Sequence, residues 1–309
     1  MPGDPIGTLI ASIIGGSEGS SGGGGGEIYK LLYDNWIIKF GLNKPLHEQY
    51  IIFIVNIATL SFGPSIIYYP RQSLDVVLWA LPWSLGLLVP AIIFGWLIGN
   101  YVGTVAAYKK GIYDKLVYPF FLSIATTPYY WFALILVTLF SGVFPIFPPG
   151  GAYDVTLMPG WNIPFIIDFL RHYTLPFLSL LIPYIGKTAV GMRAMVLYEI
   201  GSDYMDYSQS LGLPRRTLQK YAYRNAILPA LTSLPMHFGA AFTGQVISEV
   251  VFGYPGIGFV IYSAILNLDY NVIQCAFVLV IFIILSGNFI VDVIYTYVDP
   301  RILIAYKNE

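Results

Sequence analysis

The residues best placed to do chemistry gather between Gly201 and Pro229, the longest polar island in the C-terminal two thirds of the chain. Three basic residues there, Arg216, Lys220 and Arg224, recur every four positions, so a helix would present them on one face. A row of guanidinium and ammonium groups can bind an acidic surface, either of another protein or of a nucleic acid. The other charged residues of this stretch are Asp203, Asp206 and Arg215.

Two short helices around a tight turn are predicted to hold these charges. Ser202 or Asp203 can cap the first helix by accepting a hydrogen bond from a free backbone N–H. Gly212 suits the left-handed residue that ends that helix. Pro214 suits the first position of the second helix, where a missing N–H costs nothing. The segment is therefore predicted to be a helix, a turn and a basic helix.

This arrangement has three interpretations. A helix, a turn with Gly212 and a basic helix also describe a DNA-binding helix-turn-helix, in which Gln209 and Thr217 fall at suitable spacings. A positively charged loop that only sets the orientation of a membrane protein explains the charges but not the paired helices. The third interpretation, a docking surface for another protein, is implied by the family resemblance described below and explains both. Because apolar stretches flank the segment directly, no third helix completes a DNA-binding core, and nucleic acid is not an expected partner.

No constellation for catalysis is present. Gly186-Lys187-Thr188 imitates the end of a phosphate-binding loop, but Leu181 stands where that motif needs Gly, and the segment lies inside an apolar stretch. The three histidines are far apart in the sequence, and no His or Cys cluster offers metal ligands. Cys275 is the single cysteine and cannot form an intrachain disulfide. We expect no catalytic residue, cofactor or metal in this chain, so any ATP must be hydrolysed by a separate subunit.

The composition is that of an integral membrane protein. Of the 309 residues, 56% are hydrophobic and only 11% are charged, whereas a soluble domain has about 25% charged residues. The mean hydropathy is +0.68. A helix needs about 20 apolar residues to cross a bilayer. We predict an all-α membrane protein, a bundle of five transmembrane helices at about 76–107, 116–143, 175–200, 226–252 and 272–298.

Lysine and arginine set the predicted orientation, since cytoplasmic loops carry an excess of both. The loops after the first and third predicted spans, and the C-terminal tail, hold most of these residues. The opposite loops, 144–173 and 253–271, hold only Arg171. We therefore expect the C-terminus in the cytoplasm. The Pro-rich outer loop at 145–164 either covers the bundle or contacts a protein that delivers the substrate.

Three regions follow from this orientation. Residues 1–75, with a Gly-rich linker at 15–26, form an extracytoplasmic segment. Residues 76–300 form the membrane domain, which includes the cytoplasmic loop 201–225, and residues 301–309 form a cytoplasmic tail. An outer N-terminal segment needs a preceding helix to export it, so we expect one more span before Met1.

Polar residues inside predicted spans cost free energy in the bilayer, so they are candidates for function. His237 and Gln245 are eight positions apart, on roughly one helix face, and Gly239 and Gly244 allow close helix approach there. They are candidate pore-lining residues, or else polar contacts between helices. The other polar residues of this kind are Lys187, Arg193, Glu249 and Asp292.

The polar loop resembles the cytoplasmic EAA loop of ABC-transporter permeases. Asp206 is followed six residues later by Gly212 between two spans, although the Glu-Ala-Ala of the motif is here Asp206-Tyr207-Ser208. From Pro2 to Arg301 the chain is similar to the oligopeptide/dipeptide permease family. The matching stretches include Asp203-Tyr204, Gly212-Leu213, Arg224-Asn225-Ala226, Leu228-Pro229, Tyr254-Pro255-Gly256-Ile257-Gly258 and Asp299-Pro300-Arg301.

The resemblance implies the permease subunit of an ATP-driven importer in the plasma membrane, surrounded by lipid. Its implied partners are a second homologous permease subunit, two ATPase subunits and an extracytoplasmic solute-binding protein. The implied solutes are oligopeptides or dipeptides, or alternatively oligosaccharides or nickel. The loop would be a coupling helix that docks in a groove of the ATPase. The residues expected to form it are Asp203, Asp206, Tyr207, Ser208, Gly212, Leu213, Pro214, Arg215, Arg216 and Lys220.

Two rivals from other classes remain. An ion-coupled secondary transporter would carry internal repeats with broken helices at the midplane, and no repeat between the two halves is visible. A membrane-tethered DNA-binding sensor would use the basic helix on DNA. Binding of a loop peptide to DNA at physiological salt favours the sensor, and binding of the protein to an ATPase favours the importer.

The orientation gives a first prediction. A cysteine placed at position 171 should react with an impermeant reagent added from outside the cell, because Arg171 is assigned to an outer loop. A cysteine at position 110 should react only with a permeable reagent. The opposite labelling pattern would overturn the orientation, and the docking interpretation of the loop with it.

Overall fold

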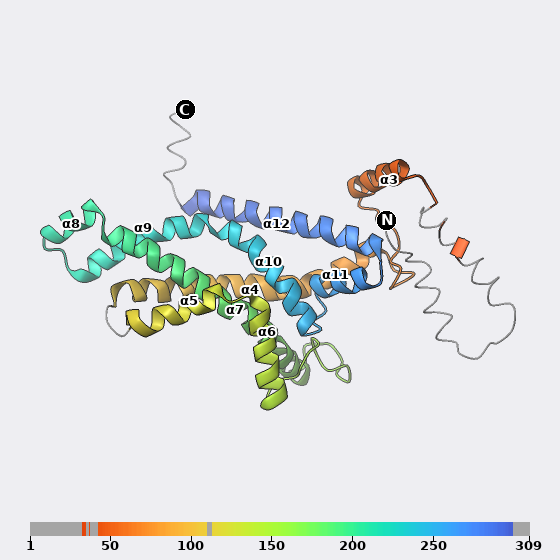
Figure 1. Ribbon diagram of the computed structural model, residues 1–309, viewed down its shortest axis with the longest axis horizontal. Helices are drawn as coiled ribbons and strands as arrows, with labels where there is room; N and C mark the ends of the chain where they lie inside the picture. Colours follow the sequence, from red (N-terminus) through yellow and green to blue (C-terminus); the bar gives the residue numbers. More distant parts are fainter. Residues whose placement is uncertain (1–32, 35–36, 38–42, 110–112, 299–309) are drawn as a thin grey trace. The chain divides into compact units, whose positions relative to one another are not determined.

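The computed structural model describes residues 33–34, 37, 43–109 and 113–298, without the side chains of 113, 114, 235–238, 240 and 294–298. Within this part the chain is built from helices and contains no strand, which confirms the predicted all-α class (Figure 1). The helices are α3 (Leu46–Thr59), α4 (Ser73–Tyr108), α5 (Tyr118–Thr126), α6 (Tyr129–Val137), α7 (Ile163–Ile200), α8 (Asp203–Ser210), α9 (Arg215–Thr232), α10 (Leu234–Val251), α11 (Ile257–Leu266) and α12 (Tyr270–Val298). Two π-helical stretches, η1 (Tyr113–Val117) and η2 (Thr138–Val143), adjoin α5 and α6.

Three of the predicted spans correspond to single long helices. Ser73–Tyr108, Ile163–Ile200 and Tyr270–Val293 are long and apolar enough to cross a membrane. The second predicted span lies on two helices, Lys115–Thr126 and Tyr129–Val143, which are bent by 100° at their break (Figure 1). Pro128 explains the bend, because a proline disfavours helical backbone in the residue before it, and Thr127 is accordingly extended at φ −78° and ψ 132°.

The fourth predicted span differs from the expectation. Residues 226–252 are divided between α9 and α10, which meet at Ser233. Pro229 and Pro235 flank this junction and each removes a backbone N–H donor. The described residues therefore contain three apolar helices long enough to span, or four if the bent pair counts as one, rather than five.

Two compact units make up the described chain. The larger contains Ser84–Pro255 and the part of α12 from Ile283. In it α7 is the central element, since it packs against α5, α6, α9 and α10. Asn162 begins α7 by accepting a hydrogen bond from the Phe165 N–H at 2.9 Å, and Pro164 occupies its first turn.

A row of glycines lets α4 approach α7 at backbone distance. A Cβ added at Gly95 would overlap the Tyr184 side chain, and one at Gly103 would overlap the Ala189 carbonyl. A Cβ at Gly99 would overlap Thr188 and lie 2.9 Å from the Ile185 carbonyl oxygen. Small residues four apart are typical of close helix pairs in membranes. Because the contact positions rise together along both helices, α4 and α7 run parallel.

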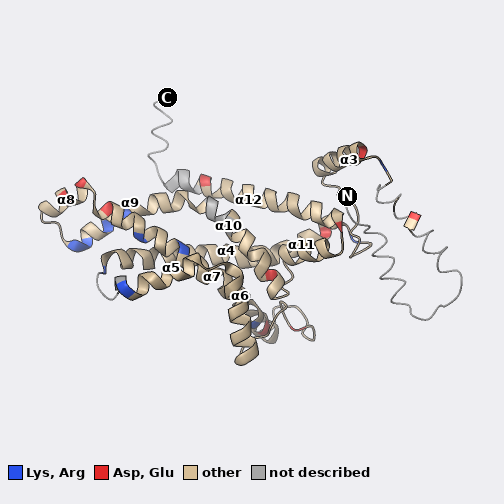
Figure 2. Ribbon diagram, viewed as in Figure 1, with Lys and Arg blue, Asp and Glu red and all other residues tan. Residues whose placement is uncertain are grey.

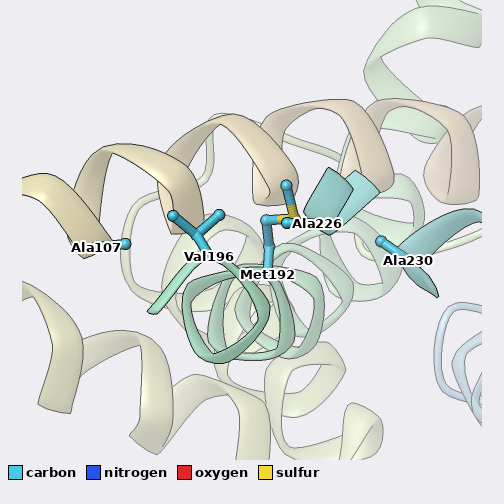
Figure 3. Packing of buried hydrophobic residues seen from close by; sticks show 5 residues of the cluster. All are labelled: Ala107, Met192, Val196, Ala226 and Ala230. Carbon is cyan, nitrogen blue, oxygen red and sulfur yellow. The ribbon is translucent and has the colours of Figure 1, made fainter. Parts of the chain in front are cut away.

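Toward its C-terminal end, α7 packs against α9 as well as α4 (Figure 3). Met192 and Val196 of α7 are buried with Ala226 and Ala230 of α9. Ala107, at the end of α4, completes the cluster. Alanines bring the helix axes close, since they add little side-chain volume between them. The end of α7 is thereby held between α4 and α9.

The smaller unit contains the described residues up to Trp83 together with Gly256–Phe282. Its fixed point is Asp269, which is fully buried just before α12. The Asp269 carboxylate accepts hydrogen bonds from the Ser65 hydroxyl at 2.6 Å and from the backbone N–H groups of Ile66 and Ile67 at 2.7 and 3.1 Å. It also accepts the Val272 N–H at 3.3 Å, so one carboxylate joins the loop before α4 to the start of α12.

The glycine row gives a second prediction. Gly99→Ala should destabilise the purified protein, because the added methyl group meets backbone and Thr188 atoms; such overpacking typically costs about 1–3 kcal/mol. Gly86→Ala is the matched control, since a Cβ there meets no atom within 4 Å. It should leave the protein unchanged or more stable by up to about 1 kcal/mol. Thermal unfolding in detergent compares the two, and equal midpoints would contradict the close approach.

Candidate functional site

The polar loop forms two helices joined by a tight turn at the end of α7. Helix α8 ends at Ser210, and Gly212 follows with φ +73°, which confirms the predicted left-handed turn residue. The Gly212 N–H donates to the Gln209 carbonyl at 2.9 Å, and the Leu213 N–H donates to the Ser208 carbonyl at 3.4 Å. This pair of bonds is a Schellman motif, which satisfies carbonyls that the last helical turn leaves free.

The start of each helix differs from the expectation by one detail. The Ser202 side chain does not cap α8; its hydroxyl donates to the Glu199 carbonyl at 2.6 Å. The reason is that α7 ends only two residues earlier, at Ile200, and offers a free carbonyl within reach. Pro214 precedes the first residue of α9 rather than occupying it, with extended backbone at ψ 143°.

Helix α9 has two faces of opposite character. Arg216, Lys220 and Arg224 are exposed. The alanines at positions 222, 226 and 230 are buried on the other side, with Ala226 and Ala230 in the cluster against α7. Figure 2 shows the basic residues along α9 and the acidic residues on α8. The predicted basic face is therefore present and is directed away from the helix packing.

All ten predicted loop residues lie in this α8–turn–α9 unit. Asp203, Asp206, Tyr207 and Ser208 belong to α8; Gly212, Leu213 and Pro214 form the turn; Arg215, Arg216 and Lys220 begin α9. Met205 is the single buried residue of α8. Tyr207 and Leu211 leave 67% and 62% of their surface exposed, which gives the unit apolar as well as charged binding groups.

Tyr204 joins three helices at one oxygen atom. Its hydroxyl donates to the Glu199 carboxylate in α7 at 2.6 Å and accepts a hydrogen bond from the Asn225 amide in α9 at 2.9 Å. Partial burial and, next, the hydrogen bond to Glu199 raise the pKa of the Tyr204 hydroxyl, so it remains a neutral donor near pH 7. The position of α8 is thus fixed to both neighbouring helices.

Arg215 fixes the start of α9 to the end of α4. Its guanidinium donates to the Tyr108 carbonyl at 3.3 Å, and a cation there is favourable because the last carbonyls of a helix carry partial negative charge. The Tyr108 hydroxyl in turn donates to the Gln219 carbonyl in α9 at 3.4 Å. Of the three basic residues expected to orient the loop, Arg215 is the one that contacts a neighbouring helix through a described hydrogen bond.

A second polar group is buried deep in the larger unit. The Gln245 amide donates to the Ser84 carbonyl at 2.6 Å and to the Glu249 carboxylate at 2.7 Å, and the Ser84 hydroxyl donates to the same carboxylate at 2.6 Å. Gln245 is 1% exposed and connects α10 to α4, as a polar contact between helices does. The side chain of His237 lies outside the described residues. A pore-lining role for these two residues stays a prediction.

Among the described residues no group of three His, Cys, Asp or Glu side chains is placed to hold a metal ion. The cations inside the α7 span rest on aromatic rings: Lys187 lies 4.3 Å from the Tyr129 ring centre and Arg193 lies 4.1 Å from that of Tyr118.

Several residues that hold the site escaped prediction as site residues. Tyr204, Glu199 and Asn225 act together, yet they are separated by up to 26 positions in sequence. Ser84 is likewise far from Gln245 in sequence, and nothing in the surrounding apolar stretch distinguishes it as a partner of Gln245. Tyr204 and Asn225 lie in stretches that match the family, but the match did not indicate that the two side chains contact each other or Glu199.

A family model and curated relatives match most of the chain. The model described as "Binding-protein-dependent transport system inner membrane component" matches residues 91–304. The oligopeptide transport system permease protein OppB of Haemophilus influenzae is 31% identical over 85% of this chain and 83% of its own length. The di/tripeptide transport system permease protein DppB of Pseudomonas aeruginosa is 29% identical over 98% of this chain and 90% of its own. AppB of Bacillus subtilis, an oligopeptide permease protein, is 30% identical over 87% and 84%.

The Tyr204 contacts give a third prediction. Tyr204→Phe removes the shared hydroxyl and keeps the ring, so α8 should detach more readily from α7 and α9. Amide hydrogen exchange in residues 203–210 should become about tenfold faster, since a hydrogen bond to a charged group contributes about 1.5–3 kcal/mol. Tyr207→Phe, on the exposed side of the same helix, is the control. Equal exchange in both variants would show that Tyr204 does not hold α8.

Proposed function

Because this chain belongs to the family of binding-protein-dependent transport system inner membrane components, we propose that it is the permease subunit of an ATP-driven importer for peptides. The single observation that carries the proposal is the α8–turn–α9 unit, which is fixed at its base to α4 and α7 and is exposed at its tip. A surface that is both anchored and exposed can pass the movement of a docked protein to the helices behind it.

Transport then proceeds by alternation of the pathway between the two sides of the membrane. ATP binding closes a pair of ATPase subunits, and their movement displaces α8, which docks in a groove of an ATPase subunit. Tyr204 carries the displacement to Glu199 of α7, and Arg215 carries it to the end of α4. Since α4 and α7 are in close contact along their glycine row, they move as one body.

The assembly that we propose contains a second, homologous permease subunit, two ATPase subunits and an extracytoplasmic solute-binding protein. ATP hydrolysis belongs to the ATPase subunits, and this chain carries no cofactor. The α8–turn–α9 unit and the C-terminus lie in the cytoplasm. The segment 1–75 lies outside, and 76–300 forms the membrane domain. The excess of basic residues on one set of loops supports this orientation.

Peptides are the proposed solute because the relatives reported above are di/tripeptide and oligopeptide permease proteins over most of their lengths. Uptake of radiolabelled dipeptides and oligopeptides by vesicles that contain the whole assembly tests this directly. If the assembly transports neither class of peptide but transports another solute such as an oligosaccharide, the chain is still an importer subunit, and the assignment of peptides as its solute is wrong.

Gly212 supplies a fourth prediction. Gly212→Val places a β-branched residue at φ +73°, a left-handed conformation that costs L-residues roughly 1–2 kcal/mol. The turn should rearrange and displace α8 from its partner. We expect the variant to insert in the membrane, to lose peptide uptake and to lose the stimulation of ATP hydrolysis by the loaded binding protein.

The control uses alanine at two glycines of the same loop. Gly201 has φ −86°, which any residue adopts, and a Cβ there would make only ordinary contacts at 3.7 and 3.8 Å. Gly201→Ala should therefore transport like the wild type, whereas Gly212→Ala should be impaired. Wild-type uptake and ATPase stimulation in Gly212→Val would end the coupling role, and would favour a loop that only sets topology.

A further inference from the structure

A pocket of about 520 Å³ lies where the segment after η2 folds against the start of α7. The segment is held in place at several points. The Gly151 N–H donates to the Phe252 carbonyl at 2.8 Å, the Ser141 hydroxyl donates to the Pro148 carbonyl at 3.1 Å, and the Tyr153 ring packs edge-on against Phe165. The pocket is lined by Pro145, Ile146, Phe147, Pro148, Asp154, Val155, Asp168, Arg171 and His172.

Both acidic side chains of the pocket are engaged within the loop. The Asp168 carboxylate accepts the Asp154 N–H at 2.7 Å and lies 3.4 Å from the His172 imidazole. The Asp154 carboxylate accepts the N–H and the hydroxyl of Thr156 at 2.9 and 2.8 Å, and these bonds lower the pKa of Asp154. Both carboxylates line the pocket and are hydrogen-bonded to the segment that forms its wall.

Arg171 is the charged group of the pocket that can receive a ligand. It is exposed, and one guanidinium N–H donates to the Ile146 carbonyl at 3.3 Å. No carboxylate among the described residues lies within ion-pair distance of it. A guanidinium has five N–H donors and binds carboxylates in a two-pronged geometry, so Arg171 keeps donors for a carboxylate from another molecule.

The loop that contributes Asp154 and Val155 to the pocket exposes large apolar side chains. Val155, Met158 and Trp161 leave 93%, 85% and 100% of their surface exposed. Tryptophan, methionine and arginine are enriched in protein interfaces, and tryptophan and arginine supply most of the strongest contacts. An arginine in a pocket beside exposed apolar side chains is thus suited to a protein surface that carries a carboxylate next to an apolar patch.

We propose that this pocket and its apolar rim form a docking surface for the solute-binding protein, with Arg171 receiving an acidic side chain of that protein. The inference rests on the proposed function, since it takes its partner from the importer and its outer location from the predicted orientation. It goes beyond that function in naming the anchoring residue and the chemistry of the partner surface: a carboxylate flanked by apolar groups.

Two other occupants are outcomes that the test separates from a protein partner. A free peptide carries an ammonium group as well as a carboxylate, and the two acidic side chains that could bind the ammonium are already hydrogen-bonded within the loop. A lipid headgroup region would suit Trp161, and its phosphate could pair with Arg171 as a carboxylate does, so the test includes a lipid readout.

The test measures docking of the purified solute-binding protein to the whole transporter in nanodiscs. Arg171→Glu should raise the Kd for docking about tenfold, and Arg171→Lys should raise it less. The difference between wild type and Arg171→Glu should shrink as salt increases.

A second variant leaves Arg171 in place. Val155→Asp puts a carboxylate into the pocket wall, where it can occupy the guanidinium from within the loop, and Val155 is exposed enough to tolerate the change. It should weaken docking as Arg171→Glu does. Val155→Asn, of the same size and without charge, is the matched control and should dock more tightly than the aspartate variant.

Different results separate this inference from the proposed function. A wild-type assembly that takes up no solute would defeat the proposed function. Normal uptake, with unchanged docking in both Arg171→Glu and Val155→Asp, would defeat only the docking surface. Unchanged docking with altered peptide preference would instead assign the pocket to the peptide. Quenching of Trp161 fluorescence by brominated lipids would assign it to the membrane, and either result overturns the proposal.

Discussion

The close approach of α4 and α7 is the constraint on which the larger unit depends. Where Gly95, Gly99 and Gly103 face α7, helix α4 adds no side chain between the two backbones. The Thr188 hydroxyl can then donate to the Gly95 carbonyl at 3.0 Å. A larger residue in place of these glycines would separate the helices and prevent this hydrogen bond. Lipid tails are as apolar as the helix surfaces, so packing and such hydrogen bonds, rather than hydrophobic burial, hold the pair together.

The same pair of helices positions the α8–turn–α9 unit. Because α4 and α7 are parallel, their C-terminal ends lie on one side, where Tyr108 and Glu199 each accept a hydrogen bond from the loop. Alanine packing brings α9 against the end of α7, close enough for Asn225 to reach Tyr204. Most of these contacts are polar and directional, so they resist rotation of α8 better than apolar packing alone would.

Polar groups in the apolar interior are hydrogen-bonded to one another across helices. Glu249, Gln245 and Ser84 bond to one another, and the Ser179 and Ser248 hydroxyls lie 2.7 Å apart between α7 and α10. Buried groups of this kind are costly unless they are paired. Each therefore restricts the relative positions of the helices that carry it, which makes α4, α7 and α10 a single framework around the interior.

The sequence by itself determined the helical class, the membrane location and the helix–turn–helix form of the polar loop. The signals were local: apolar composition over about 20 residues, Gly212, and a basic residue at every fourth position. Each signal lies within one stretch of the chain and depends only on the backbone geometry of that stretch. The tertiary structure decided the break at Ser233, the hydrogen bond that draws Ser202 to Glu199, and the meeting of Tyr204 with Asn225. It also decided the pocket at Arg171, which depends on a loop folding back onto α7. Such contacts join residues distant in sequence or in different helices, and a hydrophobicity pattern records which face of a helix is apolar but not which helix will cover it.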